Sequence, residues 1–352
     1  MRIAEIAPVW FTVPPRGYGG IELVMSLLAD GLVDRGHDVT LFASGGSATK
    51  AELVTPMEDP PDPSLLGTVW YEAYHAVASW LRVRDGDFDV VHDHSGVIGP
   101  GIGGILDGPP VVHTLHGAWT EQAKHYYALL HPHVNLVAIS EAQRNEFPAV
   151  SYAGTVYNGI DVRAFPFRDD KEDFLVFLGR VNPDKGPGIA VEIAKRRGEH
   201  LKMIVKKTEP FERDYWDRVV APQLTSDVEV YENLAHDEKV DILSRAKALV
   251  FPIRWSEPFG LVMIEAMACG TPVVTSPMGA APELVIDGVT GFLRSSFDEL
   301  AAAIDHVGDI SPAACRRRVE EHFSADAMVR GYEEIFERVT NVAGGAGFPL
   351  RE

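Results

Sequence analysis

The stretch SEPFGLVMIEAMACGTPVV, residues 256–274, places a carboxylate in the middle of an otherwise apolar segment with helical spacing. Pro258 and Gly260 mark a turn just before this segment. A buried carboxylate costs several kcal/mol unless it is paired or hydrogen-bonded. The stretch therefore predicts a turn that carries Glu257, followed by a helix in which Glu265 meets a polar partner.

Strand-like apolar runs alternate with helix-period segments on both sides of this stretch. The strand-like runs are RIAEIAPV, DVTLFAS, DVVHDHS, PVVHTLHG and NLVAIS in the first half, and FLVFLGR, KMIVKK, VEVYENL, ALVFPI and PVVTSP in the second. Such alternation predicts parallel sheets with crossover helices. We therefore expect an α/β protein made of two Rossmann-like, doubly wound domains that face each other.

The chain has 352 residues, about twice the usual length of a single domain. The Pro- and charge-rich segment VRAFPFRDDKED reads as a linker, which places an N-terminal domain at 1–165 and a C-terminal domain at 166–325. The last two segments begin with Ser caps and have helical apolar spacing. We expect residues 326–352 to form a helix that crosses back onto the N-terminal domain, followed by a tail.

Composition excludes several classes of protein. With 46% hydrophobic and 24% charged residues the chain is globular, and no apolar run reaches membrane-spanning length. The start MRIAEIAPVW lacks the features of a secretion signal, so we expect a cytoplasmic protein without an integral membrane segment. The sequence leaves the oligomeric state open.

The formal net charge of −19 opposes nonspecific binding to nucleic acid or anionic lipid, and we expect no nucleic-acid partner. Cys269 and Cys315 are too few for a disulfide framework and too far apart for a zinc motif, which predicts two reduced thiols. An anionic substrate therefore requires a specific cradle of Arg, Lys and backbone N–H groups.

In open parallel sheets, ligands bind beyond the carboxyl ends of the strands. Gly17, Gly19 and Gly20 follow the first strand-like run and precede a helix, an arrangement that lets a backbone approach an anion. The spacing is not that of the dinucleotide-binding motif. A glycine-rich turn required only for packing has the same composition.

Histidines gather at the ends of two strand-like runs: His92, His94, His113 and His116. Their residue type is suited to a metal, but they lack the helical spacing of a specific zinc motif, and we expect no metal. His116 precedes a glycine at a strand end and is the candidate for a polar contact near a reacting centre. The alternative is an ordinary hydrogen-bonded histidine.

Two cations follow the run FLVFLGR. Arg180 ends the run and Lys185 precedes a Gly-led helix. A planar guanidinium and a compact ammonium at a strand-to-helix junction suit a diphosphate. A solvated turn has a similar composition.

Residues 256–274 combine a helix start with two carboxylates, which suits a sugar nucleotide. A helix that starts near Phe259 or Gly260 offers its first N–H groups, including that of Leu261, to a phosphate. Glu265 then lies roughly 7–9 Å further along the axis, within reach of a ribose. Glu257 lies on the other side of the phosphates, where it reaches sugar hydroxyls. The alternative is two structural carboxylates that cap local backbone.

At these residues the sequence resembles the retaining glycosyltransferases of family 4, which have the GT-B fold. The resemblance covers nearly the whole chain, and its most specific element is the E-x₇-E pair with an internal P-F-G; the motifs are PPRGYGGIE, VHDHSGVIGP, HG at 116–117, YNGID at 157–161, GRVNPDKG at 179–186, EPFGLVMIEAMACGTPVV and GAAPELV. More narrowly, it is similar to a small bacterial subgroup that includes the avilamycin-pathway glycosyltransferase.

The resemblance implies transfer of a sugar, with retention, from a nucleotide-diphosphate sugar of the UDP or GDP type to an acceptor hydroxyl. The implied catalytic residues are His116, Arg180, Lys185 and Glu257. The implied donor-binding residues are Gly19, Gly20, Arg180, Lys185, Glu257, Phe259, Gly260, Leu261 and Glu265. Cations and helix N–H groups replace a divalent metal in such enzymes, so we expect no cofactor.

Two departures from the family pattern concern the nucleotide. Lys206 and Lys207 stand where the family commonly has a Gly-rich turn, which leaves the base undetermined. In MGAAPE, Gly279 is the only glycine of a turn that often has two.

We expect the acceptor to be a small molecule or a glycan, and the resemblance implies that it binds the N-terminal domain. The candidates for acceptor contacts are Trp10, His94, Trp119 and Tyr127, for which simple packing is the alternative. The segment SATKAELVTPMEDPPDPSLLG, residues 47–67, is expected to be a mobile loop beside that site. Other activities that stay open are a sugar-nucleotide epimerase, a glycan phosphorylase and a binding protein without turnover.

Overall fold

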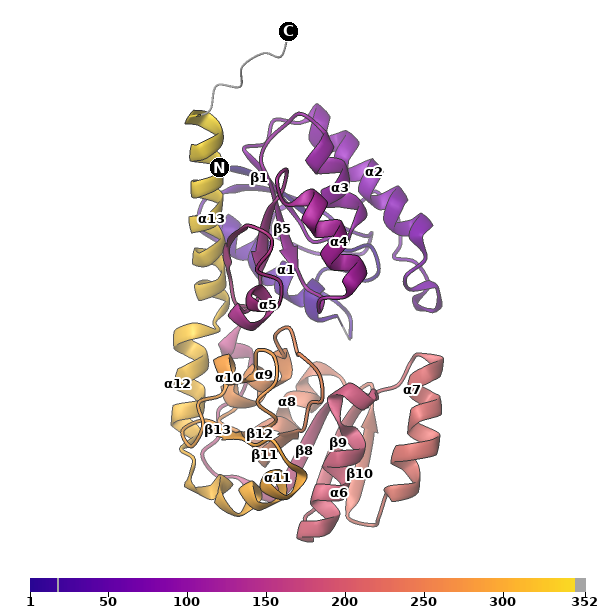
Figure 1. Ribbon diagram of the computed structural model, residues 1–352, viewed down its shortest axis with the longest axis vertical. Helices are drawn as coiled ribbons and strands as arrows, with labels where there is room; N and C mark the ends of the chain where they lie inside the picture. Colours follow the sequence, from indigo (N-terminus) through magenta and orange to yellow (C-terminus); the bar gives the residue numbers. More distant parts are fainter. Residues whose placement is uncertain (18, 346–352) are drawn as a thin grey trace. The chain divides into compact units, whose positions relative to one another are not determined.

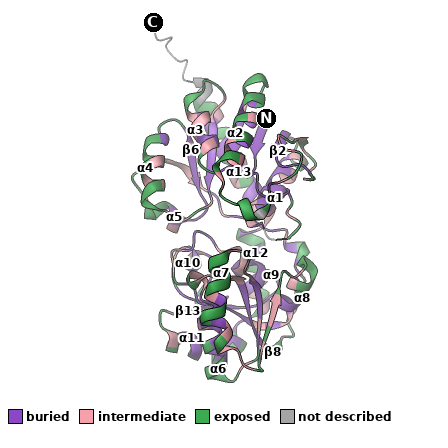
Figure 2. Ribbon diagram, turned by 90° about the vertical axis from the view of Figure 1, so that its right-hand side faces the viewer, coloured by how far each residue is buried: buried purple, intermediate pink, exposed green. Residues whose placement is uncertain are grey.

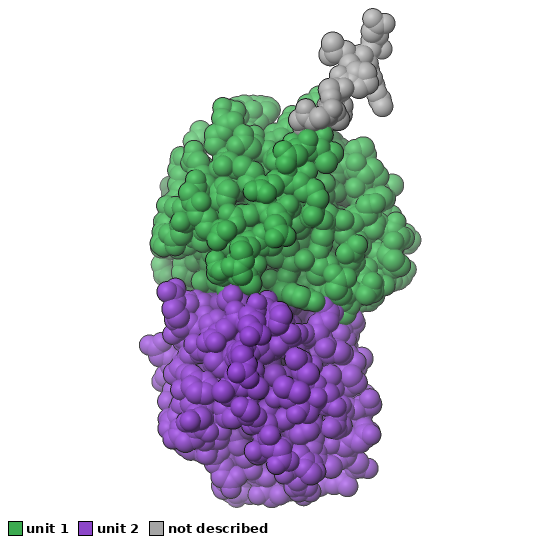
Figure 3. Space-filling model, turned by 90° about the vertical axis from the view of Figure 1, so that its left-hand side faces the viewer, with its two compact units in different colours: residues 1–159, 325–352 green, residues 160–324 purple. Residues whose placement is uncertain are grey.

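The computed structural model describes residues 1–17 and 19–345 and divides into two compact units. The N-terminal unit comprises residues 1–159 and 325–352, and the C-terminal unit comprises residues 160–324 (Figure 3). The boundaries expected from the sequence, after residues 165 and 325, lie close to these. The last part of the expected tail, residues 346–352, lies outside the described residues.

The N-terminal unit is built on a parallel sheet with the strand order β3-β2-β1-β4-β5-β6-β7. Figure 1 labels β1 and β5 of this sheet and the helices around it. Its strands are β1 (Arg2–Ile6), β2 (Asp38–Phe42), β3 (Glu52–Val54), β4 (Val90–Asp93), β5 (Val111–Leu115), β6 (Asn135–Ala138) and β7 (Tyr152–Thr155). Its helices are α1 (Gly20–Asp34), α2 (Val69–Asp85), α3 (Ile98–Ile105), α4 (Glu121–Leu130), α5 (Glu141–Glu146) and α13 (Ala325–Gly345).

The C-terminal unit is built on a second parallel sheet, with the order β10-β9-β8-β11-β12-β13. Its strands are β8 (Glu172–Arg180), β9 (Leu201–Lys206), β10 (Val228–Glu232), β11 (Ala246–Phe251), β12 (Val273–Thr275) and β13 (Gly291–Leu293). Its helices are α6 (Pro187–Arg197), α7 (Pro210–Tyr215), α8 (His236–Arg245), α9 (Leu261–Ala268), α10 (Ala281–Leu284), α11 (Phe297–Ala303) and α12 (Pro312–His322). Among the described residues of either unit, no helix combines the length and hydropathy that crossing a membrane requires.

The alternation read from the sequence is confirmed, because each strand-like run forms a strand. The central strands are buried on both faces between helices, as the purple strands and green outer helix surfaces in Figure 2 show.

Short-range sequence signals determine where the helices begin and end. Ser296 and Glu299 form a capping box at the start of α11, and Gly198 ends α6 in the left-handed conformation.

Each sheet reverses its strand order beside its first strand. In the N-terminal unit the chain adds β2 and β3 on one side of β1 and β4 to β7 on the other. In the C-terminal unit β9 and β10 lie on one side of β8, and β11 to β13 lie on the other. Loops that leave two adjacent strands in opposite directions open a crevice, so the β1/β4 and β8/β11 junctions are the expected ligand sites.

Helix α13 completes the core of the N-terminal unit. It packs on α1 where Gly31 leaves room for it, since a Cβ at that position would lie 2.6 Å from Val329. At the edge of this contact Glu333 accepts a hydrogen bond from Nε of Arg35 at 2.6 Å, and its other carboxylate oxygen lies 2.8 Å from Nε2 of His37. The predicted return of the last helix to the N-terminal domain is therefore confirmed.

The segment expected to be a mobile loop, residues 47–67, contains regular structure. Strand β3 lies inside it and pairs in parallel with β2, so that Thr40 is opposite Glu52. A single 3₁₀ turn follows at Pro63–Leu65. The sequence prediction missed β3 because its three residues, ELV, are too short to show a strand period.

Both cysteines are free and buried, as predicted from their number and spacing. Burial raises the pKa of Cys269 and that of Cys315 to about 12, so both thiols are protonated at neutral pH. They act as small apolar groups in the core.

Replacing Phe336 with Ala tests the contribution of α13 to the N-terminal unit. Phe336 is fully buried, so Phe336→Ala should lower the free energy of unfolding of this unit by roughly 3–5 kcal/mol. Urea unfolding followed by circular dichroism measures the change. Val342 lies on the same helix and is 69% exposed, so Val342→Ala should have an effect of only about 0.5 kcal/mol or less. Equal effects of the two variants would contradict the assigned packing.

Candidate active site

The loop after β8 is shaped by a sharp turn. Arg180 is the last residue of β8, and the side chain of Asn182 accepts a hydrogen bond from the backbone N–H of Asp184 at 2.8 Å. Gly186 then adopts the left-handed conformation with φ of 72°, and a Cβ there would overlap the carbonyl oxygen of Pro252. The turn thereby holds Lys185 against the loop that follows β11.

Lys185 forms an ion pair with Glu257, which joins two of the predicted site residues. The indole N–H of Trp255 donates to the same carboxylate oxygen at 2.8 Å, and the ammonium of Lys185 lies 4.5 Å from the centre of that indole ring. Both charged side chains are largely buried, with exposed fractions of 18% and 8%. Trp255 was missed by the sequence analysis, although it stands two residues before Glu257 in the same turn.

The backbone of Glu257 is fixed by the turn around Gly279. This glycine has φ of 54°, and a Cβ on it would overlap the backbone N and O atoms of Glu257. The N–H of Ala280 donates to the carbonyl oxygen of Glu257 at 2.9 Å. The single glycine of MGAAPE is therefore the one that this close approach requires.

Helix α9 begins at Leu261, one residue after Gly260, where the sequence placed a start near Phe259 or Gly260. Gly260 is its N-cap residue in the left-handed conformation, with φ of 94°, and no side chain caps the helix. The side chain of Phe259 is buried and packs edge-on against Phe323 at 6.0 Å between ring centres. The helix start therefore points its N–H groups from a well-fixed turn that lies beside Glu257.

Glu265 is buried in α9, and its partner is Lys239. The ammonium of Lys239, from α8, contacts the two carboxylate oxygens at 2.9 and 3.0 Å. Lys239 therefore offsets the cost of burying Glu265. The sequence analysis had expected ribose hydroxyls alone to do so. Lys239 was missed, although its helical spacing from the buried Ile242 and Leu243 places it on the inner face of α8.

Arg180 has a different environment from that of Lys185. Its Nε donates to Glu212 at 2.6 Å, and a second nitrogen pairs with Glu209. Glu212 is buried and also accepts from the backbone N–H of Glu209 at 3.0 Å, forming a capping box at the start of α7. Two carboxylates therefore surround the guanidinium, which the sequence prediction of a simple cation pair did not include.

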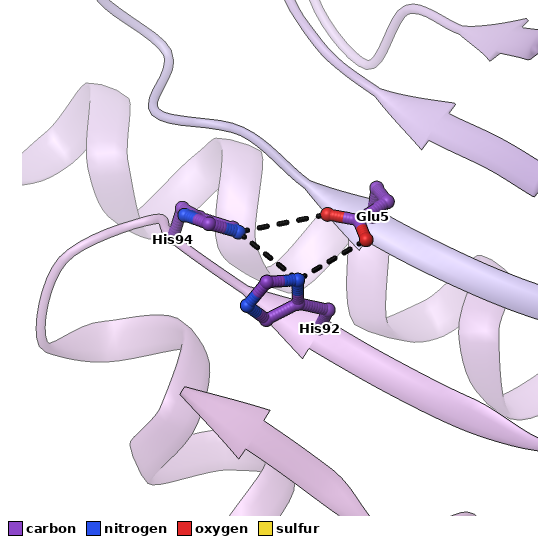
Figure 4. Close-up of side chains that lie close together, drawn as sticks. All are labelled: Glu5, His92 and His94. Carbon is purple, nitrogen blue, oxygen red and sulfur yellow. Dashed lines mark hydrogen bonds and ion pairs between the residues drawn. The ribbon is translucent and has the colours of Figure 1, made fainter. Parts of the chain in front are cut away.

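In the N-terminal unit, His116 follows β5 and contacts His94, which follows β4. Nδ1 of His94 lies 2.7 Å from Nε2 of His116, and the two rings stack with 5.0 Å between their centres. Burial lowers the pKa of His116 to about 3, with smaller contributions from nearby His113 and His92. Among the described residues, Glu5, His92 and His94 also bring metal-ligating atoms within 4.8 Å of one another (Figure 4). In the structure the carboxylate of Glu5 contacts both histidine rings, and the two rings contact each other.

The predicted glycine turn before α1 is closely packed. A Cβ on Gly19 would lie 2.7 Å from Pro15 and 2.9 Å from a carboxylate oxygen of Glu22, and Gly20 is the first residue of α1. Packing alone therefore accounts for Gly19, while a role in donor binding stays a prediction.

Each candidate acceptor residue has a partner inside the N-terminal unit. Trp10 donates to Glu72 at 3.0 Å, and Trp119 donates to the carbonyl oxygen of Gln143 at 2.8 Å. The hydroxyl of Tyr127 lies 2.9 Å from His113, and His94 is buried against His116. These contacts are those of packed side chains, and the acceptor assignment stays a prediction.

Two family models match the chain. The model described as Glycosyltransferase Family 4 matches residues 18–164, and the model described as Glycosyl transferases group 1 matches residues 161–320. The matched segments together cover most of the chain. The chain belongs to glycosyltransferase family 4. The family and the GT-B fold expected from the sequence are thus confirmed.

This family 4 glycosyltransferase is similar to characterised proteins along nearly its whole length. It is 27% identical to glycogen synthase of Mycobacterium tuberculosis over 370 aligned positions, which cover 90% of the chain and 88% of the relative. A solved structure of a glycosyltransferase involved in avilamycin A biosynthesis is 26% identical, with a TM-score of 0.73 and 98% of each chain covered. Anabaena HepE, solved with UDP and glucose, is 20% identical, with a TM-score of 0.71 and coverage of 95% and 99%.

Enzymes of family 4 are retaining hexosyltransferases, and this chain is a glycosyltransferase that takes its sugar from a nucleotide-sugar donor. Family 4 enzymes generally act without a metal.

The Lys239–Glu265 pair can be tested by its effect on stability. Lys239→Met leaves a buried carboxylate without its cation, so the free energy of unfolding of the C-terminal unit should fall by about 3 kcal/mol. The double variant Lys239→Met/Glu265→Leu should recover most of this loss, because neither charge is then left unpaired. Urea unfolding of the three proteins measures both changes. A double variant no more stable than the single one would show that the pair does not hold Glu265.

Proposed function

We propose that this enzyme transfers a hexose, with retention of the anomeric configuration, from a UDP- or GDP-type sugar nucleotide to an acceptor hydroxyl. The observation that carries the proposal is the Lys185–Glu257 pair at the β8/β11 junction. It places a cation suited to a diphosphate next to a carboxylate suited to sugar hydroxyls, where the strand order reverses.

The C-terminal unit supplies the groups that stabilise the leaving diphosphate. Lys185 pairs with Glu257, and the start of α9, which no side chain caps, lies beside the same residue. A phosphate bound there would replace Glu257 as the partner of the ammonium. As the glycosidic bond breaks, negative charge grows on the diphosphate, and these fixed groups stabilise it more than they stabilise the ground state. We assign Arg180 to the same diphosphate, held in place by Glu209 and Glu212.

The carboxylates have separate roles in this proposal. Glu257 accepts from hydroxyls of the donor sugar, and Glu265, held by Lys239, accepts from the ribose hydroxyls. His116 contacts the donor sugar. The acceptor attacks from the face that the diphosphate leaves, and a phosphate oxygen takes its proton, so the reaction requires no protein base and no divalent metal.

A pocket of about 370 Å³ in the C-terminal unit is the proposed site of the base. Lys207, Trp216, Glu232 and Asn233 line it beyond the ends of β9 and β10. Lys207 pairs with Glu232 at 2.8 Å and lies 4.5 Å from the centre of the Trp216 ring. A lysine, a carboxylate and an amide offer hydrogen bonds to the edge of a base. UDP-glucose is the first donor to test, because HepE was solved with UDP and glucose.

A thermal-shift screen of UDP-, GDP-, ADP- and dTDP-sugars identifies the donor. A donor at a hundred times its Kd should stabilise the protein by about 2.7 kcal/mol. Incubation with that donor and an acceptor, followed by NMR of the anomeric proton, then tests for transfer with retention. An altered sugar nucleotide formed without any acceptor would instead show an epimerase, and binding without turnover would show a carrier.

Lys185→Ala tests the proposed chemistry. Loss of the ammonium should lower kcat by roughly a hundredfold or more, since charge on the leaving group is then less stabilised. Lys195 lies exposed on α6, the helix that follows the same turn, so Lys195→Ala should retain wild-type kcat. Near-normal transfer by Lys185→Ala would refute the role given to this lysine.

A further inference from the structure

A buried polar network occupies the β1/β4 junction of the N-terminal sheet. Glu5 projects from β1, and His92 and His94 lie at the end of β4 (Figure 4). Glu5 and His92 are fully buried, and His94 is 3% exposed. Polar side chains in such an interior must satisfy one another, so the positions of their protons can be inferred from the contacts.

The network runs in two directions from Glu5. Oε1 of Glu5 lies 3.1 Å from Nδ1 of His92, whose Nε2 lies 2.8 Å from the hydroxyl of Thr114. That hydroxyl in turn contacts Tyr332 of α13 at 2.9 Å. In the other direction Oε2 of Glu5 lies 3.6 Å from Nε2 of His94, and that nitrogen also lies 3.2 Å from Nδ1 of His92.

Oε2 of Glu5 decides which nitrogen of His94 carries the proton. This oxygen is buried and has no hydrogen bond within the described part of the chain. Among the residues that the structure describes, only Oε1 of Glu5 has a hydrogen-bond partner, Nδ1 of His92, so a proton on Glu5 is held on Oε1 and Oε2 is an acceptor in either ionisation state. A lone pair on Nε2 of His94 facing it would be repelled, so Nε2 carries the proton and Nδ1 is the acceptor.

The proton of His116 follows from that of His94. Only one proton lies between Nδ1 of His94 and Nε2 of His116, which are 2.7 Å apart, so Nε2 of His116 is the donor. Burial holds the pKa of His116 at about 3, which keeps the ring neutral at physiological pH. A neutral imidazole with a proton on Nε2 has a lone pair on Nδ1.

We propose that Glu5 and His94 are positioning residues that hold His116 in its Nε2–H tautomer, so that Nδ1 accepts a hydrogen bond from a hydroxyl of the donor sugar. The inference rests on the proposed contact of His116 with that sugar. It adds a specificity rule: the donor must carry a free hydroxyl at the contacted position, and a deoxy sugar or an ester there is a poor substrate.

The tautomer can be measured without any donor. Long-range nitrogen–proton correlation spectra of protein containing isotope-labelled histidine distinguish Nδ1–H from Nε2–H, and a His116→Asn sample assigns the signal. We expect Nε2–H for His116 in the wild type and a mixture of tautomers in His94→Leu and in Glu5→Leu. An Nδ1–H form in the wild type, or an unchanged Nε2–H form in both variants, would overturn the proposal.

Kinetics with singly deoxygenated donors provide the second readout. For one hydroxyl the wild type should prefer the natural donor by about tenfold in kcat/KM, as expected for one hydrogen bond. His94→Leu should lose this preference, and His94→Asn should restore it because the amide oxygen can accept from His116. If His94→Leu keeps the preference, His94 has no positioning role.

His75 provides a matched control. It is a buried histidine of α2 that contacts the carbonyl oxygen of Ala7 at 3.0 Å, outside this network. His75→Leu should lose stability but keep both the His116 tautomer and the donor preference. If it changes either one, a general loosening of the unit explains the effect and the proposal fails. A fixed tautomer together with absence of sugar transfer would refute the proposed function alone.

Discussion

A carboxylate in an apolar interior must have a cation or an N–H donor beside it, and this constraint shapes both units. Glu265 meets Lys239, and Glu257 meets Lys185. Glu5 meets two histidines at the corresponding junction of the other sheet. Each buried carboxylate therefore lies beside a partner that a ligand can replace or contact. Two of the three lie where the strand order reverses, which is where the backbone itself leaves a crevice.

The two sheets use this constraint in different ways. At the β8/β11 junction the partners form a lysine–glutamate ion pair, which suits stabilisation of a departing diphosphate. At the β1/β4 junction burial lowers the pKa of His92 to about 3, so the histidines are neutral and offer directional hydrogen bonds in place of charge. In the proposed mechanism, stabilisation of the leaving group and recognition of a sugar hydroxyl therefore belong to separate units.

The sequence predicted the fold well because its signals are local and repeated. Strand and helix periods alternate along the whole chain, and Gly260 marks the start of α9 directly. The sequence did not reveal the partners of the charged residues. Lys239 lies 26 residues before Glu265, and Glu212 lies 32 residues after Arg180, so only the three-dimensional packing joins them. A short strand such as β3 has too few residues to show a period.

Helix α13 is the last of the described elements to be synthesised, yet its side chains belong to the core that begins with β1. Residues 160–324 leave the ribosome between these two parts. The C-terminal unit is contiguous and can fold during translation, whereas the first sheet has one flank uncovered until α13 has been synthesised. A nascent chain arrested before residue 325 is therefore the form most exposed to chaperones and to aggregation.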